Sequence, residues 1–339
     1  MSGGEGPKVS IVASVYNGIA YLPGFVDYID RQTFRDFELL FVVDTRSDDG
    51  TLEAVQEICS ERADSQLIIQ DGPGRLGGSK NLGLAASKGD LIWFLDVDDL
   101  PSPHFLERMV AAADDTSSDI VICNFLFTED PDWKVERIDE IITMSGETAL
   151  HARALNLIPI TSWAMLYRRG LIESNGLRFR EMMCEDIAFT YHALGASERV
   201  CFIPEPLYGY RINQTSFCRQ MEDERGLLEL DNYMLLSDSF PSDDRFMQKR
   251  FCIIGMRSLS HMTVPGIREA IKDPRLEEKA KTYLGTSGRL EYRAARLMPS
   301  LYRRFGGWYI RHFYNRYGKV YADDRKLRTL RKIVDGERS

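Results

Sequence analysis

The sequence contains few of the features that would place the chain inside a membrane or give it a disulfide framework. No stretch of its 339 residues reaches the roughly 18 uninterrupted apolar residues that a membrane-spanning helix requires, and the first residues lack the basic and apolar regions of a secretion signal. The six cysteines are scattered without a C-x-x-C pair, and the five histidines form no H-E-x-x-H pattern. We therefore expect reduced thiols, no structural zinc site and a cytoplasmic protein, whose membrane contact would be peripheral, at the inner face of the plasma membrane.

Basic residues are scarce in most of the chain. The net charge is −8, but residues 285–339 contain 14 Lys and Arg against 5 Asp and Glu, a net +9 that leaves −17 for the first 284 residues. An acidic body of this size repels nucleic-acid phosphates, so we expect no nucleic-acid partner. The composition is otherwise that of a globular protein, with 44% hydrophobic and 28% charged residues.

Apolar segments alternate with helical segments over the first half of the chain. This order predicts an α/β fold with a Rossmann-like, mostly parallel sheet flanked by helices. From about residue 222 onward the apolar spacing is helical. We expect an α/β domain over residues 1–220 and a helical C-terminal region with a basic, aromatic tail over 221–339. The predicted strands are residues 8–15, 37–43, 66–70, 91–95, 119–127 and 203–210.

Polar residues follow several of these strands, and ligands of such sheets bind beyond the carboxyl ends of the strands. The densest group is Asp96, Asp98 and Asp99, directly after the fourth strand. Neighbouring carboxylates repel one another unless a cation or hydrogen-bond donors hold them, and Mn²⁺ or Mg²⁺ prefers such oxygen ligands. We interpret the cluster as a metal and nucleotide site, with a solvated acidic turn as the alternative.

Four segments in register along the first hundred residues carry a family resemblance. Together they resemble family 2 glycosyltransferases with the GT-A fold. The resemblance is weaker up to about residue 220 and does not cover the helical remainder. The segments are residues 9–17 (VSIVASVYN), 32–39 (QTFRDFEL), 48–51 (DDGT) and 94–99 (FLDVDD).

The resemblance implies an inverting enzyme that moves a sugar from a nucleotide diphosphate sugar to an acceptor hydroxyl. Asp98 would bind the metal, and Asp96 would face the ribose and the metal. Lys80 stands where the family often has Arg and would steady the diphosphate. The positions that match the nucleotide site are Ser14, Tyr16 and Asn17.

The sequence departs from the family pattern after the second strand. The family usually carries two adjacent aspartates there, and the second often accepts a hydrogen bond from the uracil N–H. Here the pair is Asp44 and Thr45. Thr45 can form a hydrogen bond but is neutral, and Asp44 is the alternative reader. A UDP-sugar stays the favoured donor.

Glu185 and Asp186 resemble the E-D motif of the family, whose aspartate is the general base. Direct displacement at the anomeric carbon needs one carboxylate to take the proton of the acceptor hydroxyl, and the configuration then inverts. Asp186 is the expected base and Glu185 the fallback, while a helix cap is the alternative role of Asp186. Trp163 would stack on a sugar or belong to the core, and Arg211 would reach the donor phosphate or the acceptor, or form a surface ion pair.

Three rival interpretations accompany this one. Residues 72–77 (GPGRLG) match the G-x-G-x-x-G pattern of dinucleotide sites, but they follow the third strand rather than the first. A sugar nucleotidyltransferase would use the same sheet and metal, yet the loop after the first strand lacks the basic residues typical of that class. A non-catalytic scaffold of the same fold is the third. We favour the transferase, acting on a saccharide, polyol-phosphate or lipid-linked acceptor in bacterial surface-polysaccharide or cell-wall polymer synthesis.

The C-terminal tail mixes basic and aromatic residues over 301–317. On a helix this pattern is typical of a membrane-surface segment, although the Gly306-Gly307 pair disfavours an unbroken helix. Packing against the α/β domain, or against a second copy in a homo-oligomer, are the alternatives.

Overall fold

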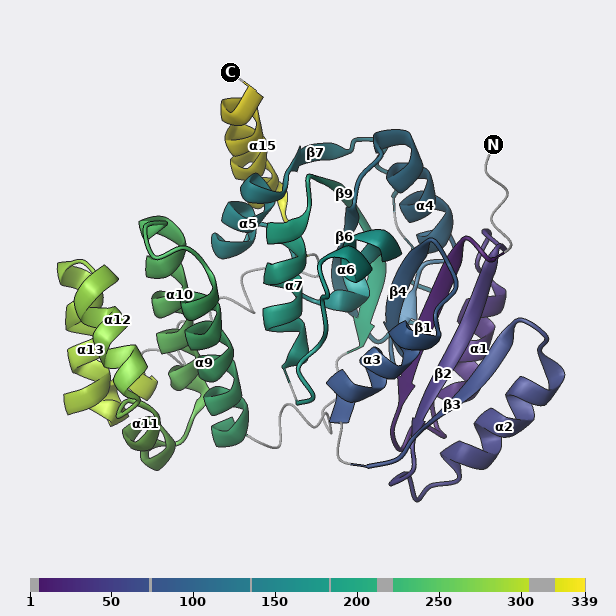
Figure 1. Ribbon diagram of the computed structural model, residues 1–339, viewed down its shortest axis with the longest axis horizontal. Helices are drawn as coiled ribbons and strands as arrows, with labels where there is room; N and C mark the ends of the chain where they lie inside the picture. Colours follow the sequence, from purple (N-terminus) through teal and green to yellow (C-terminus); the bar gives the residue numbers. More distant parts are fainter. Residues whose placement is uncertain are drawn as a thin grey trace. The chain divides into compact units, whose positions relative to one another are not determined.

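The computed structural model describes residues 6–72, 75–134, 136–182, 184–211, 222–304 and 321–338. The chain divides into two compact units (Figure 1). One comprises Met1–Ile212 together with Lys319–Ser339, and the other comprises Asn213–Gly318. We call them the sheet unit and the helical unit.

The first half of the sheet unit has the predicted alternation of strands and helices. Strands β1, β2, β3 and β4 pair in parallel in the order β3-β2-β1-β4. Their apolar runs form strands because the central ones are buried on both faces, as the burial of β1 and β2 shows. The elements are β1 (Val9–Val15), α1 (Leu22–Asp30), β2 (Phe37–Asp44), α2 (Thr51–Glu61), β3 (Ser65–Gln70), α3 (Arg75–Ala86) and β4 (Leu91–Asp96).

The second half of the sheet unit makes the sheet mixed. The short strand β8 lies between β4 and β6 and is antiparallel to both, whereas β6 and β9 are parallel. Strands β5 and β7 each pair antiparallel with β9. The mostly parallel sheet is thus confirmed for its first four strands and gains antiparallel members beyond them. The elements are β5 (Leu100–Pro101), α4 (Phe105–Thr116), β6 (Ile120–Thr128), β7 (Ile142–Ser145), α5 (Gly146–Ala154), η1 (Ser162–Ala164), β8 (Met165–Arg168), α6 (Arg169–Ser174), α7 (Glu185–Ala196) and β9 (Arg199–Arg211).

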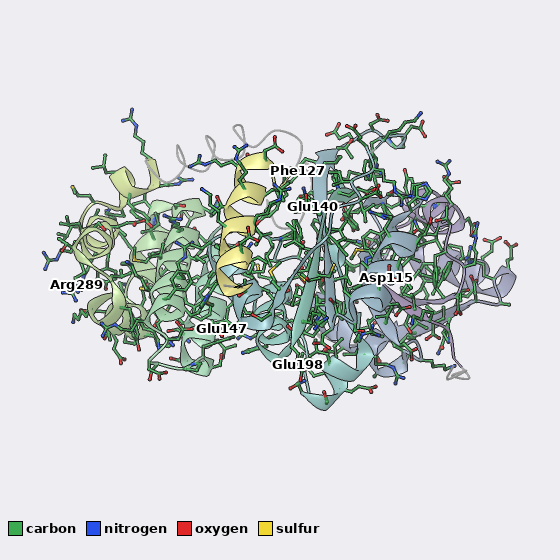
Figure 2. The ribbon with its side chains drawn as sticks, turned by 90° about the horizontal axis from the view of Figure 1, so that it is seen from above. Asp115, Phe127, Glu140, Glu147, Glu198 and Arg289 are labelled. Carbon is green, nitrogen blue, oxygen red and sulfur yellow. The ribbon has the colours of Figure 1, made fainter. Side chains whose placement is uncertain are left out.

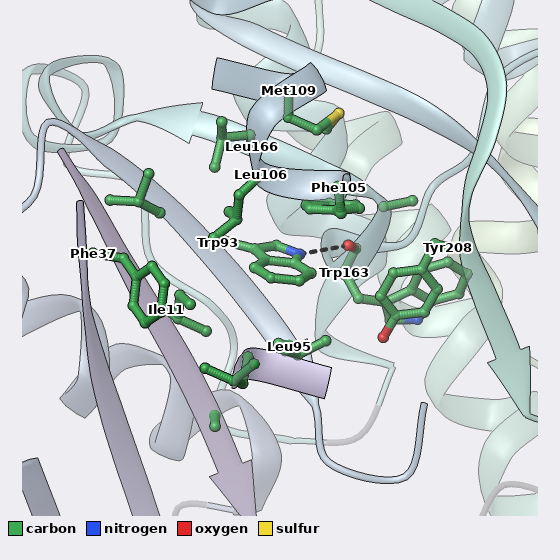
Figure 3. Close-up of a cluster of buried hydrophobic side chains, with 14 of the residues drawn as sticks. Ile11, Phe37, Trp93, Leu95, Phe105, Leu106, Met109, Trp163, Leu166 and Tyr208 are labelled. Atoms are coloured by element: carbon green, nitrogen blue, oxygen red, sulfur yellow. Dashed lines mark hydrogen bonds between the residues drawn. The ribbon is translucent and has the colours of Figure 1, made fainter. Parts of the chain in front are cut away.

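Aromatic side chains join the two halves of the sheet unit (Figure 3). Trp93 of β4 stacks on Phe105 of α4 with ring centroids 4.0 Å apart. The indole N–H of Trp93 donates to the carbonyl oxygen of Trp163 at 2.9 Å. This bond satisfies the polar edge of a fully buried ring and fixes the backbone of η1 against β4.

The end of the chain returns to the sheet unit. Asn124 of β6 donates to the carbonyl oxygen of Ala322 at 2.9 Å and accepts from its N–H at 2.9 Å. The ring of Tyr321 stacks on Phe125, with centroids 4.8 Å apart. Helix α15 (Asp324–Arg338) follows, and its Arg331 pairs with Glu140, a residue labelled in Figure 2. The predicted helical region 221–339 is therefore split, because these contacts group its last residues with the sheet.

The helical unit is built from consecutive helices. Helix α10 packs against α9 and α12, and α13 packs against α11 and α12. Of the tail at 301–317, residues 305–317 lie outside the described residues. Over the described ranges, no helix combines the length and apolarity that crossing a membrane requires. The elements are α9 (Glu222–Ser239), α10 (Arg245–Ser258), η2 (Leu259–His261), α11 (Val264–Ala270), α12 (Pro274–Tyr283) and α13 (Thr286–Leu297).

Asn124→Ala is expected to destabilise the sheet unit by about 2–4 kcal/mol, because it leaves buried backbone groups of the returning segment without partners. Urea unfolding followed by tryptophan fluorescence measures this, since three of the four tryptophans lie in the sheet unit. Asn175→Ala is the control, as its amide donates to Leu171 at 2.9 Å on an exposed helix end. This control should lower the free energy of unfolding by about 1 kcal/mol or less. Equal losses of stability in the two variants would contradict a special role for the hydrogen bonds between Asn124 and Ala322.

Candidate functional site

Three predicted residues lie together at the carboxyl edge of the parallel strands. In the register of the sheet, Ser14 of β1 is opposite Asp96 of β4, and Asp44 ends the neighbouring β2. The hydroxyl oxygen of Ser14 is buried without a hydrogen-bond partner among the described residues. A buried, unpartnered hydroxyl next to a carboxylate is available to a ligand at this edge.

The last acid of the cluster has a structural role. Asp99 is buried, accepts a 2.8 Å hydrogen bond from the hydroxyl of Tyr208 and accepts the backbone N–H of Arg211 at 2.9 Å. Burial and the charges of Asp98 and Asp96 raise the pKa of Asp99 well above its usual value. Asp99 therefore ties the acidic turn to β9.

Asp96 and Asp98 lack such partners. Neither carboxylate receives a hydrogen bond from another side chain in the described part of the protein, and Asp98 accepts one from its own backbone N–H. Burial, with the nearby charges of Asp98 and Asp186, raises the pKa of Asp96 to about 6 against the opposing charge of Lys80. Burial likewise raises the pKa of Asp98, against Arg211. Unpaired carboxylates that repel one another suit a divalent cation.

Asp96 and Asp98 could supply only part of the coordination shell of a metal ion. Within the described ranges, no three His, Cys, Asp or Glu side chains converge closely enough to enclose an ion. Mg²⁺ and Mn²⁺ commonly take one or two protein carboxylates and complete their shell with water and substrate phosphate. Asp96 and Asp98 fit that kind of site.

A buried cation lies at the centre of a second cluster. The ammonium of Lys80, on α3, donates to Glu185 at 2.6 Å, to Asp186 at 3.0 Å and to the hydroxyl of Ser162 at 2.9 Å. Only 2% of the Lys80 side chain is exposed. The expectation that Lys80 steadies a diphosphate directly is not supported, because its three hydrogens are taken by protein groups.

The two acids of the E-D pair differ in accessibility and in ionisation. The Glu185 side chain is 4% exposed, whereas that of Asp186 is 18% exposed. Burial raises the pKa of Glu185 to about 7 despite Lys80. Burial also acts to raise the pKa of Asp186, but the charge of Lys80 and hydrogen bonds from Ser162 and Lys80 lower it overall. Asp186 is thus the ionised and more accessible carboxylate.

Ser162 orients Asp186. Its hydroxyl donates to one carboxylate oxygen of Asp186 at 2.7 Å, and its backbone N–H donates to the other at 3.2 Å. Neither Lys80 nor Ser162 is near this acid in sequence, so sequence reasoning did not connect them. The helix-cap interpretation of Asp186 does not account for these long-range partners.

Within residues 72–77, Gly77 allows a close approach between α3 and the segment that leads into α7. A Cβ at Gly77 would lie 1.8 Å from the carbonyl oxygen of Arg180 and 3.2 Å from the Cβ of Glu185. Gly72 has φ +108°, which L side chains rarely adopt. Residues 73 and 74 lie outside the described residues. Gly77 therefore brings α3, and with it Lys80, against the segment that carries Glu185.

The carboxyl edge of the parallel strands, where the nucleotide site is predicted, contains a residue that sequence reasoning missed. Arg46 binds both carboxylate oxygens of Asp44, through its Nε at 2.8 Å and through Nη2, and lies 5.9 Å from the ring centroid of Tyr16. The charge of Asp44 is thereby balanced by that of Arg46. The hydrogen bonds from Arg46 are the chief cause that lowers the pKa of Asp44, so its carboxylate stays ionised. Asp44 is consequently a poor candidate for reading a base, while Tyr16 is 57% exposed and Thr45 is exposed. The sequential proximity of Asp44 and Arg46 was the available signal.

The remaining motif residues hold the loops of this edge together. Asn17 accepts the backbone N–H of Asp48 at 3.0 Å, and its own N–H donates to Ser47 at 3.2 Å. The hydroxyl of Thr51 accepts the N–H of Gly18 at 2.9 Å. The DDGT segment thus joins the loop after β2 to the loop after β1, and Asn17 acts from within that junction.

Trp163 and Arg211 are placed differently. Trp163 is 4% exposed and stacks on Tyr208 and Tyr210, so the core alternative holds and its ring is not open to a sugar. Arg211 forms no ion pair with the described residues, and its Nε is buried without a partner among them. Its charge acts on Asp98. Arg211 therefore remains a candidate for an anionic ligand.

Comparisons with known proteins identify relatives of the chain. The sequence model of Glycosyl transferase family 2 matches residues 10–176. The chain is 31% identical over 229 residues to the putative glycosyltransferase EpsH of Bacillus subtilis (strain 168), covering 64% of each chain. The match thus spans just under two thirds of the length of that relative.

Solved structures share the fold. Residues 1–349 of S. aureus TarS, in complex with UDP-GlcNAc, align with a TM-score of 0.55 at 16% identity, over 85% of this chain and 90% of that one. The mannosyltransferase PcManGT from Pyrobaculum calidifontis, in complex with GDP-Man and Mn²⁺, aligns with a TM-score of 0.55 at 16% identity, over 88% and 87%. The chain belongs to glycosyl transferase family 2 and has the GT-A fold with a helical C-terminal region.

Proposed function

We propose that the chain is a metal-dependent, inverting glycosyltransferase that transfers a sugar from a nucleotide diphosphate sugar to an acceptor hydroxyl. One observation carries the proposal. The charges of Asp186 and Lys80 act on the pKa of the unpaired Asp96, so the carboxylate beside Asp98 lies close to the Asp186 cluster. Direct displacement of the diphosphate by the acceptor hydroxyl requires a cation site for the leaving group and, next to it, a general base in a fixed position.

Asp96 and Asp98 would hold Mn²⁺ or Mg²⁺. Such an ion supplies charge that stabilises a departing diphosphate. Arg211, whose charge acts on Asp98 and whose Nε has no hydrogen-bond partner among the described residues, would contact the same phosphates. Ser14 offers its unpartnered hydroxyl, and Tyr16 offers an exposed ring for a nucleobase.

Asp186 would take the proton of the acceptor hydroxyl. Lys80 and Ser162 fix its two oxygens and keep it ionised. Glu185 shares Lys80 and sits deeper, so it acts as a positioning residue rather than as the base. One accessible carboxylate, rather than a pair facing the sugar, is consistent with inversion.

The donor and acceptor follow from what relatives bind. One structural neighbour is described with UDP-GlcNAc and another with GDP-Man and Mn²⁺. We favour a UDP-sugar, with Thr45 at the base. The acceptor is a saccharide, polyol-phosphate or lipid-linked hydroxyl in bacterial surface-polysaccharide or wall-polymer synthesis, in line with the relative TarS, a poly(ribitol-phosphate) β-N-acetylglucosaminyltransferase. Nucleoside diphosphate release from a panel of UDP-, GDP- and dTDP-sugars, with acceptors, distinguishes a transferase from a nucleotidyltransferase or a non-catalytic scaffold.

Asp98→Ala is expected to weaken binding of the donor roughly tenfold or more in the presence of Mn²⁺, because it removes a cation ligand. Titration calorimetry with the sugar nucleotide, with and without Mn²⁺, measures the change. Asp90→Ala is the matched control, since Asp90 is exposed at the opposite end of the same strand. Undiminished, Mn²⁺-dependent binding by the Asp98 variant would remove the metal assignment.

Asp186→Asn is expected to leave donor binding within about twofold while lowering transfer by about 10²–10⁴-fold, the usual contribution of a general base. Glu147→Gln is its control, because Glu147 occupies the first turn of α5 in the same way and is exposed. A simple helix-dipole role predicts similar small effects for both variants. Near-normal transfer by Asp186→Asn would show that another group is the base.

The turnover number is expected to fall as the pH is lowered through about 7, the pKa of Glu185. Protonation of Glu185 leaves Lys80 to pair more strongly with Asp186, which makes Asp186 a weaker base. Asp186 itself has a lowered pKa and stays ionised in this range. Glu185→Gln should therefore give a flat profile between about pH 6 and 8 at a reduced rate. Persistence of the inflection in that variant would assign it to another group.

A further inference from the structure

Helix α13 presents an apolar surface on the outside of the helical unit. Leu290 and Leu297 are 58% and 75% exposed, and their spacing of seven residues puts them on one face of the helix. Met298 and Leu301, which lie beyond the end of α13, are 51% and 43% exposed. Tyr292 and Ala295 of the same helix are buried. The helix thus packs by one face on its neighbours and exposes the two leucines on another.

Arginines border this apolar face. Arg289, Arg293 and Arg296 are all exposed on α13, and Arg289 is labelled at the edge of the view in Figure 2. Residues 286–304 contain five arginines and one glutamate. Arg296 has an ion pair with Glu277 at 3.3 Å, whereas no ion pair forms between Arg293 and the described residues. Apolar and cationic groups therefore share one surface of a chain whose net charge is −8.

We infer that this face of α13, made of Leu290 and Leu297 with the arginines of the same helix, docks on an anionic lipid membrane. A helix with leucines flanked by guanidinium groups lies in the plane of a bilayer, with the leucines at the acyl boundary and the cations at lipid phosphates. Charge complementarity selects this occupant. A second copy of the chain, joined by a two-fold axis, would place like-charged arginines against one another. The inference goes beyond sugar transfer, and it requires neither a donor nor a metal.

Flotation of the full chain with phosphatidylcholine vesicles, with and without phosphatidylglycerol, tests this docking. Wild-type protein should float with the anionic vesicles, remain in solution with the neutral ones, and dissociate as salt is raised. The double variant L290Q/L297Q should show a partition coefficient lower by roughly tenfold or more. The double variant R289Q/R293Q should lose the preference for anionic vesicles. Leu227→Gln, which removes a 41% exposed leucine from α9, is the control and should bind as wild type does.

Two results would overturn the inference. One is a wild-type protein, shown to be folded by circular dichroism, that stays in solution with anionic vesicles. The other is a self-association in sedimentation velocity that L290Q/L297Q abolishes while vesicle binding is unchanged, which would assign the surface to a second copy. Neither result bears on the transferase proposal, because no sugar nucleotide is present in these experiments.

Discussion

The buried ammonium of Lys80 is the group on which the arrangement of the site depends. Removing a charge from water costs several kcal/mol unless partners replace the lost hydration, and here three partners do so. They come from η1 and from the first turn of α7, more than 80 residues along the chain from Lys80. The cation thereby fixes the second half of the sheet unit against α3 of the first half, and Gly77 allows the approach that this requires.

The carboxylates of this edge are of two kinds, those with a protein partner and those without one. Glu185 and Asp186 contact Lys80 directly, and Asp99 and Asp44 are satisfied by Tyr208 and Arg46. Asp96 and Asp98 are left without such partners in the described protein, and burial raises the pKa of both acids because it disfavours their charged forms. Two carboxylates that repel each other and have no side-chain partner, among neighbours that have one, indicate a ligand site. Such arrangements do not serve folding and are found chiefly at functional sites.

Much of the fold follows from local sequence signals. The parallel half of the sheet was predicted from the buried apolar runs that form β1, β2 and β4. The family was predicted from the four motif segments. The antiparallel β8 was missed because Met165–Arg168 is four residues long and lacks a turn signal of its own. The candidate acids were found because clustered aspartates are visible in sequence. The partners of Lys80 were not, since contacts over a separation of 105 residues leave no local pattern. The role of Arg46 depends on side-chain direction, which spacing alone does not determine.

The returning C-terminal segment is in packing contact with the site through a continuous series of side chains. Tyr321 stacks on Phe125, and Phe125 meets the edge of Trp163 with centroids 4.8 Å apart. Trp163 precedes Ala164 within η1, the turn whose first residue, Ser162, holds Asp186. A close-packed interior resists displacement of any one ring. The segment at Tyr321 therefore helps to fix the backbone of η1, which orients the proposed base.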